Sequence, residues 1–143
     1  MAAPAEKLED TLLSVRNLSL DFSSPEGSVH ALRDIGFDVP RGRIVGVVGE
    51  SGCGKSTLAS TMIRLLPENA EIVGGRITFD GDDILAMSES RMRDLRGRRM
   101  SMIFQDPMTA LNPVRSIGAQ MLEIQHHEDA SRADKRKKAV RML

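Results

Sequence analysis

The residues best able to do chemistry lie in the run Gly-Glu-Ser-Gly-Cys-Gly-Lys-Ser-Thr, which spans positions 49–57. Four of them fit the spacing G-x-x-x-x-G-K-[ST] of a phosphate-binding loop, the Walker A motif. Glycines let the backbone curl closely around a polyphosphate, so that successive N–H groups form a nest for an anion. We therefore expect the whole run to line a phosphate site. Its residues are Gly49, Glu50, Ser51, Gly52, Cys53, Gly54, Lys55, Ser56 and Thr57.

Two side chains of this loop have expected roles. Lys55 should reach the β- and γ-phosphates of a nucleotide, and the Ser56 hydroxyl should ligate Mg²⁺. A helix that begins near Lys55 would aim its unpaired N–H groups and positive dipole end at the same phosphates. The alternative is a glycine-rich turn that carries no ligand. The position of the loop, between a strand-like run and a helix-like run, favours the phosphate site.

The flanking sequence predicts the elements that hold the loop. Ile44 to Val48 is apolar at nearly every position, as is typical of a strand buried on both faces. After the loop, Leu58, Met62 and Leu65 recur at i, i+4 and i+7. This spacing predicts an amphipathic helix that Pro67 ends.

The first forty residues predict a small antiparallel sheet. Residues 11–22 alternate in polarity, but the phase slips at Arg16-Asn17, which indicates a β-bulge or two short strands. The run 23–27 has the chemistry of a turn, and residues 35–39 alternate as a second strand. Residues 1–10 are expected to be a disordered lead-in.

Downstream of the loop the pattern alternates between strands and short helices. Residues 76–79 predict a strand closed by an Asp-Gly turn, and residues 100–104 predict a second buried strand. Serines that can cap a helix predict helices from about residues 88 and 131. The spacing of Ile117, Met121 and Ile124 predicts another helix from about residue 116. The arginines between positions 91 and 99 are interpreted as a solvated helix face.

Composition excludes several function classes. The 143 residues carry 20 basic and 20 acidic side chains, so no overall field favours nucleic acid. Four Phe and no Trp or Tyr argue against a base-stacking platform for single strands. Cys53 is the one cysteine, which suits a reducing cytosol. No apolar run approaches the roughly 18 residues that span a bilayer, and no signal peptide is evident. We expect a soluble chain that is able to dock onto a membrane protein.

Three segments together resemble one known family. The segments GESGCGKST, GGRITFDGDDIL and SMIFQDPMTALNP are similar to the ATPase subunit of an ATP-binding cassette (ABC) transporter, and most similar to the dipeptide/oligopeptide importer type. The resemblance runs from about Leu12 to Leu143. It implies an α/β fold: a P-loop NTPase core with an N-terminal antiparallel β-subdomain. Residues 11–143 would be the amino-terminal part of that domain, with an incomplete helical subdomain beginning after about residue 106.

The resemblance also implies site residues and cofactors. Gln105 would be the Q-loop glutamine, which touches the Mg²⁺ site and senses the membrane-spanning subunit. Lys55 and Gln105 would then be catalytic, Ser56 and Gln105 would ligate the metal, and the cofactors would be ATP and Mg²⁺. Phe22 falls where the family places an aromatic that stacks on adenine, although a lone Phe at a strand end is as readily a core residue.

The sequence departs from the family in its later motifs. It contains no LSGGQ-like signature, no apolar strand ending in Asp-Glu and no switch histidine. We therefore expect an amino-terminal portion, inactive by itself, of an ATPase that powers import of peptides or related solutes. The family implies a second ATPase subunit in a homo- or heterodimer, membrane-spanning permease subunits and, indirectly, a solute-binding protein. It also implies a cytoplasmic location on the inner face of the cell membrane.

Two other classes of function stay open. One is a different P-loop NTPase, such as a small-molecule kinase. A GTPase would need an N-K-x-D motif, and the sequence has none. The other is a non-catalytic fragment that only binds nucleotide.

Overall fold

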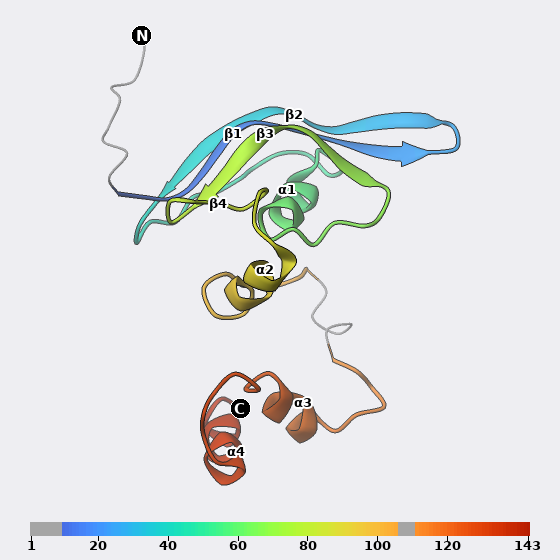
Figure 1. The fold of residues 1–143 in the computed structure, drawn as a ribbon. Helices are drawn as coiled ribbons and strands as arrows, with labels where there is room; N and C mark the ends of the chain where they lie inside the picture. Colours follow the sequence, from blue (N-terminus) through green and yellow to red (C-terminus); the bar gives the residue numbers. More distant parts are fainter. Residues whose placement is uncertain (1–9, 106–110) are drawn as a thin grey trace. The chain divides into compact units, whose positions relative to one another are not determined.

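The computed structural model describes residues 10–105 and 111–143. The chain divides into two compact units after Ser101. The first unit contains a four-stranded antiparallel sheet of order β2-β1-β3-β4 and two helices, and the second contains two helices (Figure 1). The strands are β1 (Thr11–Ser24), β2 (Gly27–Pro40), β3 (Ala70–Phe79) and β4 (Asp82–Asp83); the helices are α1 (Lys55–Met62), α2 (Glu89–Leu95), α3 (Ile117–Glu123) and α4 (Arg132–Arg141). The lead-in expected at residues 1–10 falls, but for Asp10, outside the described residues.

The long hairpin of β1 and β2 confirms the predicted antiparallel sheet. Its register shifts between Val15 and Leu18, at the position where the polarity changes phase. Asn17, inside this irregularity, has a φ of 49°, a left-handed conformation that asparagine tolerates better than most residues. The bulge lets Val15 and Leu18 both turn inward, and both are fully buried. The predicted bulge is therefore confirmed, and one continuous strand accommodates it.

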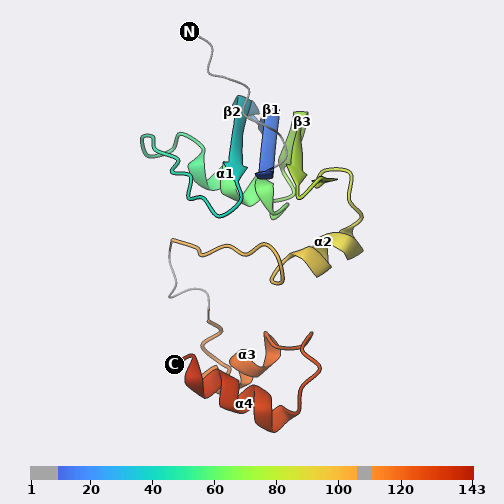
Figure 2. The same ribbon diagram turned by 90° about the vertical axis from the view of Figure 1, so that its left-hand side faces the viewer.

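The core of the first unit lies between the sheet and the two helices. Figures 1 and 2 show α1 and α2 on the same side of the sheet. Leu58 of α1 and Met92 of α2 are buried in the same apolar cluster as Leu20 of β1 and Ile77 of β3. The helix that follows the phosphate loop is thus fixed to the sheet by apolar packing, the main source of its stability.

The first helix is shorter than the sequence predicts. We expected it to run to Pro67, but α1 ends at Met62. Arg64 adopts a left-handed φ of 51°, which breaks the helical path three residues before the proline. The second helix follows the prediction, because the Ser88 side chain accepts a hydrogen bond from the Arg91 amide and caps α2.

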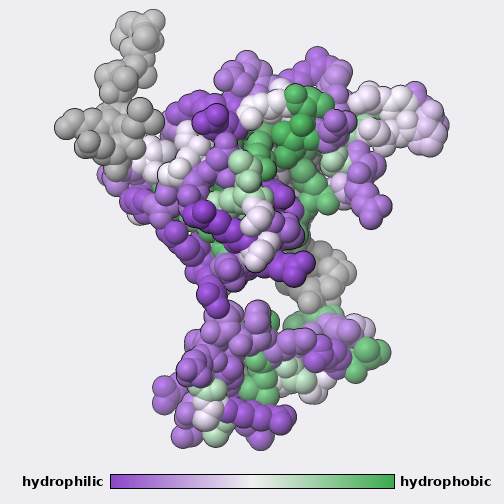
Figure 3. Space-filling view, in the orientation of Figure 1, coloured by the Kyte–Doolittle hydropathy of each residue, from purple (hydrophilic) through white to green (hydrophobic). Residues whose placement is uncertain are grey.

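Two predicted strands are wrong. Residues 44–48 form no strand, and Ile44 and Val48 are 100% and 97% exposed. Residues 101–104 are likewise irregular, and Ile103 is 95% exposed. A strand exists only where a neighbour accepts its backbone hydrogen bonds, and neither run joins a ladder within the described residues. Apolar side chains of these runs therefore reach the surface. Figure 3 shows hydrophobic residues at the surface on one face of the molecule.

The second unit packs α3 against α4. Both helices begin at the predicted serines: Ser116 accepts from the Ala119 amide, and Ser131 accepts from the Asp134 amide. Gln125, 4% exposed, donates to the carbonyl oxygen of Lys135 at 3.2 Å and so ties the turn after α3 to α4. The predicted helices of this unit are confirmed.

Candidate nucleotide-binding site

The phosphate loop leads directly into α1. Gly54 is the N-cap residue of this helix, with a φ of 93°, and it supplies no side-chain hydrogen bond to the first turn. Gly52 also has a positive φ, 81°. These conformations are open to glycine and strained for other residues, and they leave the amide groups of the first helical turn without a side-chain cap. The helix terminus can therefore act as an anion site.

The Lys55 side chain folds back across the loop. Its Nζ atom donates to the carbonyl oxygens of Gly49 at 2.8 Å and of Glu50 at 2.5 Å, and it lies 3.5 Å from the Sγ atom of Cys53. The carbonyl groups of the loop thus accept hydrogen bonds from the lysine of the same loop. This holds the ammonium group over the loop backbone, where a bound phosphate would meet it.

The loop sits tightly against β2. A Cβ atom on Gly54 would lie 2.8 Å from the carbonyl oxygen of Ala31 and 3.1 Å from the Cδ2 atom of Leu32. A Cβ atom on Gly49 would lie 2.7 Å from the Sγ atom of Cys53. Close approach to the backbone therefore requires glycine at position 54, whereas the neighbour of Gly49 is a side-chain sulfur that can move away. The glycine at position 54 joins the loop to the sheet.

A cleft of about 520 Å³ opens beside the loop. One side is made by the loop from Gly52 to Thr57, and the other by the tip of the β1–β2 hairpin. Phe22 of β1 lies on this second side, paired across the hairpin with Val29 of β2. The structure therefore brings Phe22 to the same cleft as Lys55 and Ser56, although Phe22 is far from them in the sequence. Gly49, Glu50 and Ser51 belong to the loop but are not among the residues that line the cleft.

Gln105 belongs to the second unit. It is exposed and lies at the end of an irregular run, immediately before residues 106–110, which are outside the described residues. The prediction that Gln105 and Ser56 share a metal ion concerns two separate units, so it stays a prediction.

Sequence reasoning missed a group of side chains beside the loop helix. The arginines between positions 91 and 99 were interpreted as a solvated face, and Arg91, Arg93, Arg98 and Arg99 are indeed exposed. Arg96 differs, because its side chain is only 20% exposed and contacts the end of α1. No periodicity distinguishes this arginine from its neighbours, so only the structure reveals it.

Comparison with known proteins identifies the family. Residues 32–143, which include the loop and α1, match the ABC transporter family. The chain belongs to this family. The ABC transporter assignment agrees with the antiparallel sheet, the glycine-rich loop and the helix that follows it.

The most similar relatives found are named as peptide transport proteins. The chain is 48% identical over 136 residues to the probable peptide ABC transporter ATP-binding protein y4tR of Sinorhizobium fredii, covering 94% of this chain and 41% of that protein. It is 44% identical over 140 residues to the oligopeptide transport ATP-binding protein OppD of Escherichia coli, covering 97% and 41%. The chain therefore spans about two fifths of the length of the curated ABC transporter relatives it matches.

Solved ABC transporter structures share the fold. A bacterial ABC transporter cassette solved as a dimer matches with a TM-score of 0.75 at 20% identity, over 90% of this chain and 54% of the cassette. The cbiO1 protein of Clostridium perfringens, described as part of an ABC transporter complex, matches with a TM-score of 0.63 at 28% identity, over 91% and 47%. The fold class predicted from the sequence is confirmed. Among the described residues, no helix is long and apolar enough to cross a membrane.

Proposed function

We propose that this chain binds ATP with Mg²⁺ in the cleft beside residues 49–57, as the amino-terminal part of an ABC-type ATPase. The observation that carries the proposal is the meeting of Phe22 and Lys55 at one cleft. An aromatic ring can stack on a base, and an ammonium group with helix N–H groups can hold phosphates. The same cleft thus has a group that can stack on the base and groups that can bind the phosphates.

The residues of the loop fit this role individually. Lys55 would bind the β- and γ-phosphates, and the backbone from Gly49 to Thr57 would bind the phosphate oxygens. The Ser56 hydroxyl would ligate Mg²⁺, which prefers oxygen ligands and keeps several waters. Mg²⁺ would neutralise phosphate charge during phosphoryl transfer. Gln105 would complete the metal site from the second unit.

The names of the relatives support a proposal for the activity of the whole protein. Several are named as ATP-binding proteins of peptide, dipeptide or oligopeptide transport. We therefore propose that the complete protein hydrolyses ATP to power import of peptides or related solutes. In this proposal it works as a homo- or heterodimer of ATPase subunits on permease subunits, at the cytoplasmic face of the membrane. A solute-binding protein delivers the cargo.

The experiment compares two ligands and two variants by calorimetry. Lys55→Ala should weaken both ATP and inorganic tripolyphosphate roughly 10- to 100-fold, because hydrogen bonds to charged groups contribute about 1.5–3 kcal/mol. Phe22→Ala should weaken ATP and leave tripolyphosphate unchanged. Lys137→Ala, which removes an exposed lysine of α4, is the matched control. Equal ATP affinity for the wild-type chain and Lys55→Ala would sink the proposal.

Turnover provides a second measurement on the same samples. Phosphoryl transfer requires a group that orients the attacking water, and the sequence offers no Asp-Glu strand end for this task. The purified chain should therefore bind ATP without releasing phosphate above background. Steady phosphate release that Lys55→Ala abolishes would contradict this expectation.

A further inference from the structure

The carboxyl end of α1 has an unusual residue at its stop. The Leu65 amide donates to the Ser60 carbonyl at 2.9 Å and the Arg64 amide to the Thr61 carbonyl at 3.0 Å, which is the Schellman arrangement. Glycine usually occupies the left-handed position of this motif, but here it is Arg64, with a φ of 51°. A non-glycine residue is strained in this conformation, so surrounding contacts must hold it.

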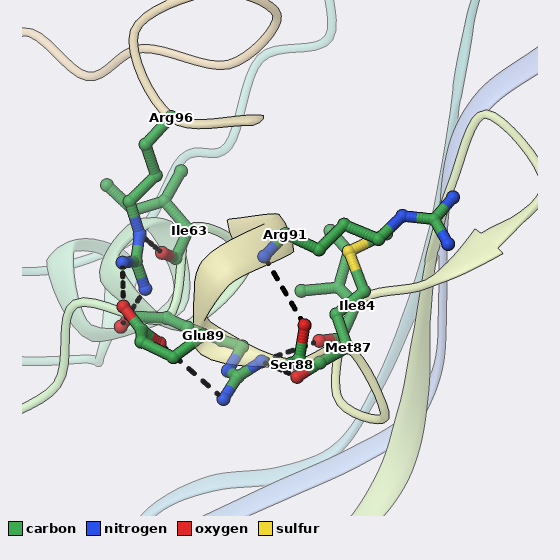
Figure 4. Close-up of polar contacts among 8 residues, drawn as sticks. Ile63, Ile84, Met87, Ser88, Glu89, Arg91 and Arg96 are labelled. Carbon is green, nitrogen blue, oxygen red and sulfur yellow. Dashed lines mark hydrogen bonds and ion pairs between the residues drawn. The ribbon is translucent and has the colours of Figure 1, made fainter. Parts of the chain in front are cut away.

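Arg96 supplies the contacts that hold this helix end. Its Nε atom donates to the Ile63 carbonyl at 2.8 Å, and its Nη2 atom donates to the Arg64 carbonyl at 2.9 Å. Figure 4 shows the Arg96 side chain beside Ile63 and Glu89. A cation at these carbonyls satisfies acceptors that the helix leaves unpaired, and it complements the negative end of the helix dipole.

A carboxylate and a second arginine complete the group. Glu89 accepts from the Nη1 atom of Arg96 at 2.6 Å and lies 3.9 Å from the Nη2 atom of Arg64. Arg64 in turn donates to the carbonyl oxygens of Ile84 at 3.2 Å and Met87 at 2.7 Å. The hydrogen bond from Arg96, and then the charges of Arg96, Arg64 and Arg93, hold the pKa of Glu89 below its usual range. We call Arg64, Glu89 and Arg96 the arginine clasp.

Backbone hydrogen bonds and buried neighbours fix the position of Arg96. The Arg96 amide donates to the Met92 carbonyl at 2.9 Å, and the Gly97 amide donates to the Met100 carbonyl at 2.7 Å. Met92 is fully buried and Leu95 is 8% exposed, so α2 is packed into the core of the first unit. The guanidinium of Arg96 is thus fixed relative to the sheet and not only to α1.

We propose that Arg96 is a positioning residue of the phosphate site, acting through α1. The inference rests on the proposed function of the loop. The helix is only eight residues long, about 12 Å at 1.5 Å per residue, with Lys55 at its first position and the clasp just after its last residue, Met62. A rigid element this short transmits a tilt at one end to the other. Arg96 therefore fixes the direction in which the loop amides and Lys55 point.

A purely structural role would lower stability without a specific effect on phosphate affinity. The test therefore compares Arg96→Ala with two controls. Arg91→Ala removes an exposed arginine of α2, the helix that Arg96 follows, and this arginine pairs with Asp82 at 2.7 Å. Leu13→Ala truncates a buried residue of β1, which lowers stability but removes none of the hydrogen bonds of the clasp. All variants are measured at a temperature where circular dichroism shows them folded.

Two measured quantities, ligand affinity and hydrogen-exchange rate, are expected to change in Arg96→Ala and not in the controls. Calorimetry should show MgATP and tripolyphosphate each bound roughly tenfold more weakly, with both controls within twofold of wild type. Hydrogen exchange without nucleotide should be faster at the amides of residues 52–57, which the controls leave unchanged. If folded Arg96→Ala keeps wild-type affinity and exchange, Arg96 only stabilises the fold and the proposal is overturned.

A milder variant covers the case in which Arg96→Ala does not fold. Arg96→Lys keeps the charge but cannot donate to two carbonyls and a carboxylate in one plane, so its loss of affinity should be smaller and of the same kind. Wild-type affinity and exchange in Arg96→Lys would then overturn the proposal. If the wild-type chain binds no ATP, the proposed function fails instead. The exchange rates of residues 52–57 still decide whether Arg96 positions the loop.

Discussion

Gly54 approaches Ala31 so closely that a Cβ atom on the glycine would lie 2.8 Å from the alanine carbonyl oxygen. The neighbour is backbone, so no rotamer change can relieve the contact. The φ of 93° at Gly54 adds a second obstacle, because L-residues rarely adopt it. The glycine therefore links the sheet and the phosphate loop, and its role is separate from any contact with a ligand.

The first prediction is that Gly54→Ala damages both stability and binding. The free energy of unfolding should fall by about 1–3 kcal/mol from backbone strain, and ATP affinity should fall at least tenfold because the loop must shift. Thermal melting and calorimetry measure the two effects. The loss of affinity in Gly54→Ala should come from the changed position of the phosphate loop itself.

Gly42→Ala is the matched control for this prediction. Gly42 also has a positive φ, 65°, but a Cβ atom there would meet nothing within 4 Å. It lies in the turn after β2, away from the cleft. Its substitution should cost about 1 kcal/mol of stability and leave ATP affinity unchanged. Equal effects of the two substitutions on affinity would show that close approach at Gly54 does not matter.

The sequence predicts local features of the fold well. The phase slip at Arg16-Asn17, the caps formed by Ser88 and Ser131 and the glycine-rich loop each depend on neighbouring residues alone, and all are present. Only the family resemblance predicted that Phe22 lies at the nucleotide site. The alternation of residues in β1 does not show which other part of the chain its ring faces.

The wrong predictions concern features that depend on residues far away in the sequence. The run Ile44 to Val48 has the composition of a buried strand, yet burial requires strands beside it and none pairs with it among the described residues. Likewise, α1 was expected to reach Pro67 because nothing local marks Arg64 as a stop. At that stop Arg96 donates to the Arg64 carbonyl, and this contact joins residues 32 positions apart. Such long-range hydrogen bonds leave no periodic signal.

The second prediction concerns acid stability and Asp80. The pKa of its carboxyl is lowered, first by the hydrogen bond from Arg99 and then by the one from Arg41. A lowered folded-state pKa contributes stability above the unfolded value, about 3.9, and this contribution disappears as the pH falls through the folded value. Asp80→Asn should therefore be less stable than wild type at pH 6, and the two should converge as the pH falls from about 5 toward 2.

Urea unfolding followed by circular dichroism across this pH range tests the prediction. Asparagine tolerates the left-handed φ of 52° at this position, so backbone strain does not confuse the comparison. Asp94→Asn is the control, because Asp94 is exposed and forms no ion pair among the described residues. A constant gap between wild type and Asp80→Asn at every pH would argue against the ion pairs as its cause.

The third prediction is that Ser56 and Gln105 share one Mg²⁺. A hydroxyl and an amide oxygen are plausible but incomplete ligands for an ion that prefers six oxygens. A neutral glutamine can also leave the metal at little electrostatic cost, which suits a switch better than a carboxylate would. The measurement is ATP affinity of the wild type, Ser56→Ala, Gln105→Ala and the double variant, each with Mg²⁺ and with a chelator.

The dependence on metal separates a shared site from unrelated effects. Both single variants should lose affinity of several-fold with Mg²⁺ and little with the chelator, whereas Lys55→Ala should lose it in both conditions. Because the two side chains would hold the same ion, the double variant should lose less than the sum of the single losses. Additive losses, or a Gln105→Ala variant that binds MgATP as wild type does, would rule out a shared ion and leave Ser56 as the metal ligand of this chain.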